Sequence, residues 1–239
     1  MMALPTRENL ILAAIPPAER YRIVRQMEPV DLPPDTILSE ANQPVEHVYF
    51  LTSGTGGILA TMSDGRAVQT ACIGAEGFIG LSVMLGVDQM PMTAVQQIAG
   101  SGLRMRAAAF ADEVRTETAF RERLHRFAGL LLMQVTQNAA CNRLHDAPAR
   151  CARWLLLSSD RLGRHELPLT HESIGQMLGA SRPAASTPVR ALETDGIIEQ
   201  SRGWITITNR AELEARACEC YSVLRQEWRE YLDSLSLGR

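Results

Sequence analysis

The stretch from residue 169 to residue 207, LTHESIGQMLGASRPAASTPVRALETDGIIEQSRGWITI, restricts the fold of this chain more than any other. Thr170 can cap a first helix, and Gly179 follows where a helix stop is expected. A second helix begins two residues later, with Ser181 as its N-cap candidate. The runs GIIEQ and WITIT flank Ser201-Arg202-Gly203 and predict a two-stranded hairpin with a tight turn. Two helices joined by a short turn and followed by a hairpin are typical of a winged helix-turn-helix that binds DNA.

The second of these helices has two contrasting faces. Its apolar positions recur at i, i+3, i+4 and i+7 and share an inward face: Ala185, Pro188, Val189 and Leu192. The outward face is short-chained and polar, as a helix entering a major groove requires, and it holds Arg182, Pro183, Ser186, Thr187 and Arg190. Pro188 removes a backbone hydrogen bond, which costs roughly 3 kcal/mol in a regular helix, so we expect a bend or an early end there. A helical pair that packs without binding DNA is the alternative that the pattern alone leaves open.

Length and composition allow two ordinary domains. The chain has 239 residues, of which 46% are hydrophobic and 21% charged, as in many globular proteins. It contains no apolar run of membrane-spanning length, and its N-terminal sequence lacks the pattern of a signal peptide. Its five cysteines include no CxxC pair, which argues against a secreted disulfide framework. We therefore expect a cytoplasmic protein without a membrane partner.

The charge of the chain does not resemble that of a protein that coats nucleic acid. All 24 basic residues are arginine, a bias that the source genome explains more simply than function does, and the formal net charge is −3. Between residues 161 and 203 the arginines and the acidic residues balance. A positive surface for DNA must therefore arise from geometry, and we expect binding to weaken steeply as salt increases.

The N-terminal half predicts short helices at residues 7–27 and then a β-rich segment at 31–105. Short apolar runs separated by glycines predict its strands: TIL, VYFLTSG, GGILATM, AVQTACIG and TAVQQIAG. Several short strands at close intervals suggest a jelly roll or a β-roll. After a glycine-rich portion, the run SVMLG can form one helical turn.

A long helix is predicted from Ala119 to Leu144. Leu124, Phe127 and Leu131 have the spacing of a parallel helical seam, so we expect two copies of the chain to pair along it. Burial of this stripe against the chain's own β-roll is the alternative. Residues 146–148 mark a hinge, an amphipathic helix follows, and AELEARACECYSVLRQEWREYLDSL predicts a further helix beyond the wing.

The order of these elements resembles the Crp/Fnr superfamily of bacterial transcription regulators over nearly the whole chain. The segments that carry the resemblance are HVYFLTSG, SDGRAV, IGAEGFIG, ARWLL, LTHESIGQMLGASR, LETDGIIEQSRGWITI and LEARACECY. The resemblance implies an α+β fold with a cyclic-nucleotide-binding-like β-roll at 1–116, a dimerisation helix at 117–145 and a winged helix-turn-helix with a C-terminal helical extension at 146–239. It also implies a homodimer on a two-fold-related DNA site, with RNA polymerase recruited or blocked. By position, Arg182, Ser186, Thr187 and Arg190 would contact bases or phosphates, and Thr170, Ser181 and Arg202 the DNA backbone.

The resemblance places an effector pocket in the β-roll, and its residues would be Gly77, Phe78, Ile79, Gly80, Leu81, Met92, Thr93 and Ala94. In family members that bind cyclic AMP, a Glu follows the Phe-Ile-Gly motif and an Arg-Ser pair holds the phosphate. Here Leu81 follows Gly80, and no arginine occurs between Arg66 and Arg104. A buried phosphate without a cationic partner is costly. The sequence therefore argues against cyclic AMP and favours an uncharged or apolar effector, or a vestigial pocket.

Other cofactors find little support in the sequence. The first cysteine is Cys72, so the N-terminal iron–sulfur cluster of some family members is not expected. Haem would need an axial ligand such as His47 or Cys72, which we interpret as strand residues. Cys141 and His145 lie at i and i+4 on one helix face and are weak candidates for a metal or redox site, with buried structural roles as the simpler explanation. Cys218 and Cys220, if both lie on a helix, point in nearly opposite directions and are not expected to share an ion.

The sequence does not predict an enzyme. The five histidines, His47, His125, His145, His165 and His171, are scattered without the partners of a catalytic constellation. A regulator that needs no effector, and a nucleotide-binding regulatory module of another system, are alternatives to a signal-responsive regulator. A regulatory module of another system would lack a winged helix.

Overall fold

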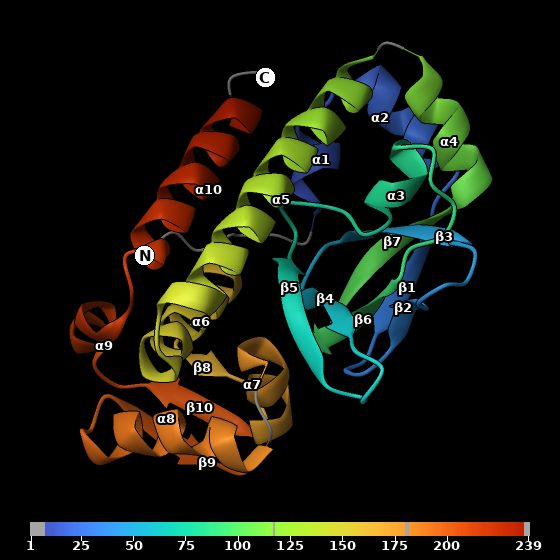
Figure 1. Ribbon diagram of the computed structural model, residues 1–239. Coiled ribbons are helices and arrows are strands. Elements are labelled where there is room, and N and C mark those ends of the chain that lie inside the picture. Colours follow the sequence, from blue (N-terminus) through green and yellow to red (C-terminus); the bar gives the residue numbers. More distant parts are fainter. Residues whose placement is uncertain (1–7, 117, 180–181, 237–239) are drawn as a thin grey trace. The chain divides into compact units, whose positions relative to one another are not determined.

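The computed structural model describes residues 8–116, 118–179 and 182–236 (Figure 1). The chain divides into two compact units. Of the described residues, the β-roll unit contains 8–58, 72–116, 118–132 and 227–236, and the winged-helix unit contains 59–71, 133–179 and 182–226. The division runs through the long helix that follows the β-roll.

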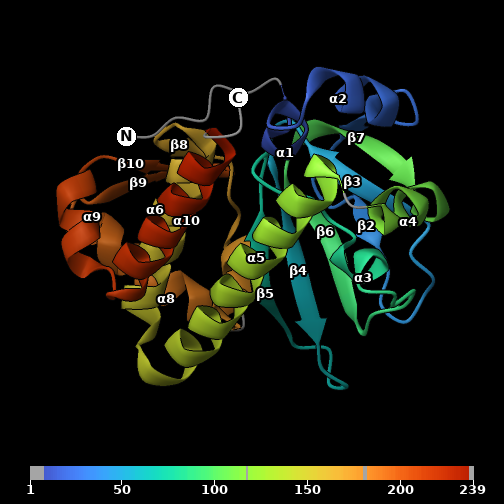
Figure 2. The same cartoon turned by 90° about the horizontal axis from the view of Figure 1, so that it is seen from above.

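Seven strands form the two sheets of the β-roll (Figures 1 and 2). They are β1 (Glu28–Leu32), β2 (Ile37–Ser39), β3 (His47–Leu51), β4 (Thr55–Thr61), β5 (Ala67–Ile73), β6 (Met92–Ile98) and β7 (Gly100–Arg106). One sheet has the order β1-β7-β3 and the other β2-β6-β4-β5. The predicted strand runs are confirmed, whereas β1 and β7 lay outside them. In β1, Pro29 and two acidic residues hide the alternation.

All five phenylalanines of the chain meet in the core of the β-roll unit. Phe50, Phe78, Phe110, Phe120 and Phe127 are at most 2% exposed. The ring centroids of neighbouring pairs lie 5.3 to 6.2 Å apart, within the range in which aromatic pairs attract beyond their area burial. Because Phe120 and Phe127 come from the long helix, this cluster fixes the first half of that helix against the β-roll.

Short helices surround the strands of this unit: α1 (Leu10–Ala13), α2 (Pro17–Val24), α3 (Leu81–Met84) and α4 (Ala107–Arg115). The first three confirm the predicted helices at 7–27 and the predicted helical turn in SVMLG. Asn9 caps α1, because its side-chain oxygen accepts hydrogen bonds from the backbone N–H groups of Ile11 and Leu12.

Helix α5 (Ala119–Leu144) has the predicted length, but its apolar stripe does not face outward. Leu124 is fully buried and Phe127 is 2% exposed, both within the β-roll unit, and Leu131 is half-buried. Leu124 and Phe127 therefore do not form the predicted dimer seam. The alternative, burial against the chain's own β-roll, is correct for these two residues, since the aromatic cluster claims that face of the helix.

The winged-helix unit contains α6 (Ala147–Leu162), β8 (Glu166–Leu167), α7 (His171–Leu178), α8 (Arg182–Thr194), β9 (Ile198–Ser201), β10 (Trp204–Ile207) and α9 (Arg210–Arg216). Its sheet has the order β8-β10-β9, so the predicted hairpin gains a third, two-residue strand that was too short to predict. Asp146 caps α6, with Pro148 in its first turn, as expected of the hinge.

The C-terminal extension is not one helix. Helix α9 ends at Arg216, and α10 (Cys220–Ser236) begins only after a break at residues 217–219. Ala217, at the C-cap of α9, has extended backbone angles that no helix can continue. In the described residues, no helix is long and apolar enough to cross a membrane.

Candidate DNA-binding interface

The first helix of the helix-turn-helix, α7, is capped at its N-terminus and ends before a glycine. The Thr170 hydroxyl accepts a hydrogen bond from the backbone N–H of Ser173 at 3.1 Å, and Gly179 follows α7 in the left-handed conformation at φ +62°. Both features agree with the expectation from the sequence. In α7, Ile174 and Met177 are buried, and the exposed Thr170 stands at the N-terminus of the helix.

Helix α8 separates its apolar and polar residues as the pattern predicts. Val189 and Leu192 are almost fully buried, and Pro188 is buried beside them. Thr187 and Arg190 are exposed, and Ser186 is half-buried. Of the two outcomes predicted at Pro188, a bend or an early end, the early end is wrong, because the helix continues to Thr194. Burial of the neighbouring apolar side chains offsets the backbone hydrogen bond that the proline removes.

Two predicted DNA contacts lie at the edge of what the structure describes. Ser181 lies outside the described residues. Arg182 is the first residue of α8, and its side chain lies outside them as well. The exposed polar face of the helix is therefore defined here by Thr187 and Arg190.

The wing presents a second basic position. Residues Trp204 to Ile207 pair with Ser201 to Ile198 in antiparallel register, and Gly203 turns the hairpin at φ +78°. Arg202, in the turn, is exposed as expected of a contact to the DNA backbone. Arg164, which was not among the predicted DNA contacts, also lies on this surface, and its guanidinium is 5.7 Å from the ring centroid of the exposed Trp204. An arginine and a tryptophan far apart in the sequence carry no local signal of this stacking.

The candidate effector residues lie in the core of the β-roll unit. Gly77, Phe78, Ile79 and Ala94 are buried, while Gly80, Leu81, Met92 and Thr93 are half-buried. A Cβ atom on Gly77 would come within 2.1 Å of the Phe127 ring. The ring of Phe127 therefore lies directly on Gly77 and occupies the space there.

The buried hydroxyl of Tyr231 lies beside the Gly77 backbone, and it already has a hydrogen-bond partner within the protein. The Tyr231 hydroxyl donates to the backbone carbonyl of Glu76 at 2.8 Å, and Arg123 donates to the carbonyl of Ser234 at 2.9 Å. Burial, with a smaller contribution from the Glu76 carboxylate, raises the pKa of Tyr231 well above its ordinary value, and Arg123 opposes this shift. The C-terminal part of α10 thus packs next to the predicted pocket.

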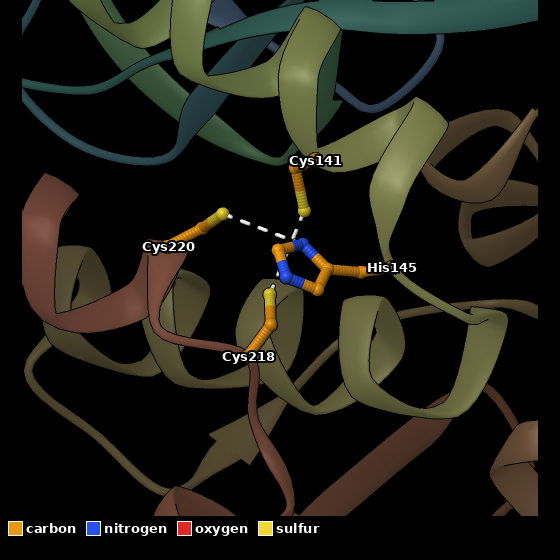
Figure 3. Close-up of side chains that lie close together, drawn as sticks. All are labelled: Cys141, His145, Cys218 and Cys220. Atoms are coloured by element: carbon orange, nitrogen blue, oxygen red, sulfur yellow. Dashed lines mark hydrogen bonds between the residues drawn. The ribbon is translucent and has the colours of Figure 1, made fainter.

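The weak metal candidates Cys141 and His145 lie close to Cys218 and Cys220, two cysteines that were not expected to share an ion. One ligand atom from each of Cys141, His145, Cys218 and Cys220 lies within 4.8 Å of every other (Figure 3). The expectation that Cys218 and Cys220 point in opposite directions is wrong, because Cys218 precedes α10 rather than lying on a helix. The hydrogen bond between the Cys141 and Cys218 thiols lowers the pKa of Cys218 and raises that of Cys141.

Comparisons with known proteins agree with this architecture. Residues 149–216 match the Crp-like helix-turn-helix domain, and residues 29–117 match the cyclic nucleotide-binding domain. A relative from Mycobacterium tuberculosis (strain CDC 1551 / Oshkosh), a CRP-like cAMP-activated global transcriptional regulator, is 25% identical over 85% of this chain and 91% of its own length.

Solved structures share the fold. A crp/fnr family regulator from Eubacterium rectale has a TM-score of 0.69 at 19% identity and covers 87% of this chain and 99% of its own. FixK2 from Bradyrhizobium japonicum has a TM-score of 0.69 at 20% identity and covers 80% of this chain and 98% of its own.

The winged helix-turn-helix and the cyclic-nucleotide-binding-like β-roll define the class: this is a Crp-like transcription regulator with a helix-turn-helix DNA-binding domain. The chain belongs to the Crp/Fnr superfamily.

Proposed function

We propose that the protein acts as a homodimer on a two-fold-related operator, with one α8 helix from each copy in the major groove. The exposed pair Thr187 and Arg190 on α8 carries this proposal, because a short hydroxyl and an arginine fork are suited to base edges and phosphates. Arg202 on the wing would contact the DNA backbone. The bound dimer would recruit or block RNA polymerase.

The exposed face of α5 is the surface along which two copies would pair. Leu132 is 68% exposed and Met133 is 42% exposed, which is unusual for large apolar side chains on a long helix. Gly129, Thr136 and Ala140 are exposed at helical spacing from Leu132 and allow a close approach of a second helix. This face replaces the seam that the sequence predicted at Leu124 and Phe127.

The signal sensed by the β-roll would not be cyclic AMP. The relative from Mycobacterium tuberculosis is described as cAMP-activated, but this chain has no arginine between Arg66 and Arg104, and Arg66 forms an exposed ion pair with Asp64. A nucleotide phosphate would thus lack a partner from the segment predicted to hold it. An uncharged or apolar molecule agrees better with Met92 and Ala94.

A regulator without a small-molecule effector is a second candidate, and one observation favours it. The Phe127 ring fills the space against Gly77, and its centroid lies 5.3 Å from that of the Phe78 ring. In that case the abundance of the dimer would set its activity.

Capture of genomic DNA fragments by the purified protein at physiological salt tests the proposal, with cyclic AMP present or absent. We expect enrichment of one two-fold-symmetric motif, equal in both conditions. Arg190→Ala should weaken binding to that motif by roughly 1–3 kcal/mol. If Arg190 contacts a phosphate, the slope of log K against log salt concentration should fall by about one. Arg229→Ala serves as the matched control, because Arg229 is an exposed arginine on α10.

Three results would contradict parts of the proposal. Unchanged binding by Arg190→Ala would show that α8 does not present this face to DNA. Enrichment only in the presence of cyclic AMP would show that cyclic AMP is the effector, against the proposal. A motif without two-fold symmetry would refute the dimeric mode of binding.

A further inference from the structure

The Cys141, His145, Cys218 and Cys220 side chains form one compact group, which we call the thiol–imidazole cluster. Cys141 comes from the last turn of α5, His145 from the residue directly after that helix, Cys218 from the break after α9, and Cys220 from the start of α10 (Figure 3). All four belong to the winged-helix unit. None of the three thiols is in a disulfide, each is at most 7% exposed, and the His145 side chain is 21% exposed.

The spacing of the ligand atoms matches a single tetrahedral ion. The Cys141 and Cys218 sulfurs are 3.5 Å apart, and the Cys220 sulfur is 3.6 Å from His145 Nδ1. Around a zinc ion with Zn–S bonds of about 2.3 Å, the edges of the ligand tetrahedron are about 3.8 Å long. All four ligand atoms lie within 4.8 Å of one another, so side-chain shifts of about 1 Å or less let them surround one ion, and Cys₃His is a ligand set of structural zinc sites.

The surroundings of the histidine match those of a metal ligand. His145 Nε2 lies 3.1 Å from the Glu219 carboxylate, while Nδ1 faces Cys220. Metal-bound histidines almost always donate their second ring N–H to a carboxylate, a carbonyl or a water, which fixes the tautomer and the orientation of the ring. Glu219 thus leaves Nδ1 as the nitrogen that faces the ion.

A buried arginine supplies the charge that such a site requires. Three thiolates and one divalent cation leave a single net negative charge, which would be costly to bury alone. Arg153 is fully buried, and its charge acts on Cys141, Cys218 and Cys220. Its Nη1 donates to Asn138, whereas Nε and Nη2 have no hydrogen-bond partner in the described part of the chain. Gln137 also donates to the Cys220 sulfur at 3.0 Å.

We propose that the thiol–imidazole cluster binds one Zn²⁺ ion through Cys141, His145, Cys218 and Cys220, with Glu219 and Arg153 as its supporting partners. The ion would join the end of α5 to the start of α10 within the winged-helix unit. An iron–sulfur cluster agrees less well, because it distributes its ligands over several irons and so spreads them farther apart.

Metal analysis of the purified full chain, prepared without chelators, is the direct test. We expect about one zinc ion per chain, and the zinc content should fall at least about tenfold in Cys141→Ala and Cys218→Ala. Cys151→Ala is the matched control and should keep its zinc, because Cys151 is an equally buried thiol of the same unit outside the cluster.

A second measurement uses the unaltered chain, in case the variants do not fold. Zinc is removed with a chelator and Co²⁺ is added, and we expect the intense visible bands of tetrahedral cobalt with thiolate ligands to saturate at about one equivalent. His145→Gln should shift these bands without abolishing thiolate charge transfer. The cobalt spectrum tests the ligand set without any assay of DNA binding.

Any of three outcomes would overturn the proposal. The first is a chain without stoichiometric metal that also gives no tetrahedral cobalt spectrum. The second is stoichiometric iron together with inorganic sulfide. The third is a Cys141–Cys218 disulfide in freshly purified protein, which would identify the pair as a redox couple instead.

Discussion

Asn9 shows how one buried side chain connects several segments of the β-roll unit. Its amide nitrogen donates to the carbonyls of Leu51 at 3.0 Å and Gly77 at 2.7 Å, while its oxygen caps α1. The residue is 1% exposed, so water cannot replace these partners. Asn9 therefore fixes the backbone of Gly77, which the sequence places in the candidate effector pocket.

We expect Asn9→Ala to lower the free energy of unfolding by about 2–4 kcal/mol, because it removes a helix cap and leaves two buried carbonyls unpaired. Urea unfolding of the full chain measures the change. Asn9→Ser is the control, since its hydroxyl can still cap α1 and should recover part of the loss. Equal stability of Asn9→Ala and the parent would show that α1 does not depend on this side chain.

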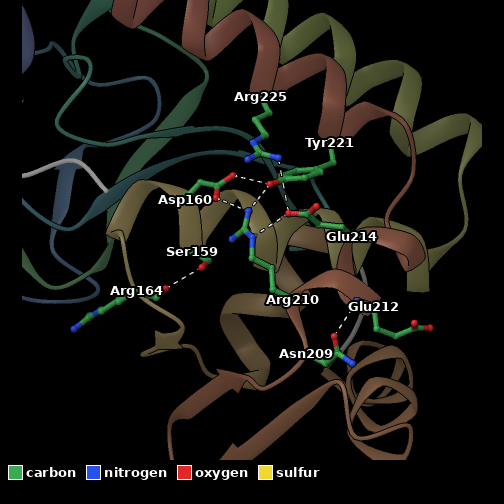
Figure 4. A network of polar contacts seen from close by, with 9 residues as sticks. All are labelled: Ser159, Asp160, Arg164, Asn209, Arg210, Glu212, Glu214, Tyr221 and Arg225. Atoms are coloured by element: carbon green, nitrogen blue, oxygen red, sulfur yellow. Dashed lines mark hydrogen bonds and ion pairs between the residues drawn. The ribbon is translucent and has the colours of Figure 1, made fainter. Parts of the chain in front are cut away.

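Helices α6, α9 and α10 meet at a buried ion pair (Figure 4). Arg210 donates to Asp160 at 2.7 Å and to the Tyr221 hydroxyl at 2.6 Å, and that hydroxyl donates to the second Asp160 oxygen at 2.9 Å. Only 6% of the Asp160 side chain is exposed. Breaking such a pair is costly, because the remaining charge stays buried.

Arg210→Ala should therefore destabilise the protein by about 3–5 kcal/mol in urea unfolding. Arg216→Ala provides the comparison, because its ion pair with Asp195 is nearly half exposed on both sides. We expect that second change to be about 0–1 kcal/mol. Similar losses in the two variants would mean that burial does not determine the strength of the Arg210 pair.

Sequence periodicity predicted helices and strands well but could not assign the partner of each face. The stripe at Leu124 and Phe127 is equally suited to a second helix and to a sheet, and only the meeting of all five phenylalanines decides between them. The break at residues 217–219 was missed for a similar reason, since no proline or glycine marks it. The caps at Thr170 and Gly179 were predictable because capping depends on adjacent residues.

At the scale of the whole molecule, the proposed dimer depends on the α5 surface that the aromatic cluster leaves uncovered. Leu132 is the most exposed large apolar residue of its central part, next to Met133. One copy of the chain has few basic residues in its winged helix to contact DNA, and its net charge is negative. Two linked half-sites would supply the affinity that one copy lacks.

Leu132→Arg should convert the dimer to a monomer, because it places like charges opposite one another in an apolar seam. Sedimentation velocity measures the change in mass, and operator binding should fall in parallel. Val223→Arg is the control, as Val223 is an exposed apolar residue of α10. A Leu132→Arg protein that still sediments as a dimer would place the interface elsewhere.

The break between α9 and α10 has a consequence for how this regulator can differ from its relatives. Cys218 and Cys220 follow the end of the matched helix-turn-helix domain at residue 216, and Cys141 and His145 lie between the two matched domains. The whole thiol–imidazole cluster thus occupies connecting segments that neither shared domain includes. Two regulators with the same two domains can therefore differ in a metal site through their connecting segments alone.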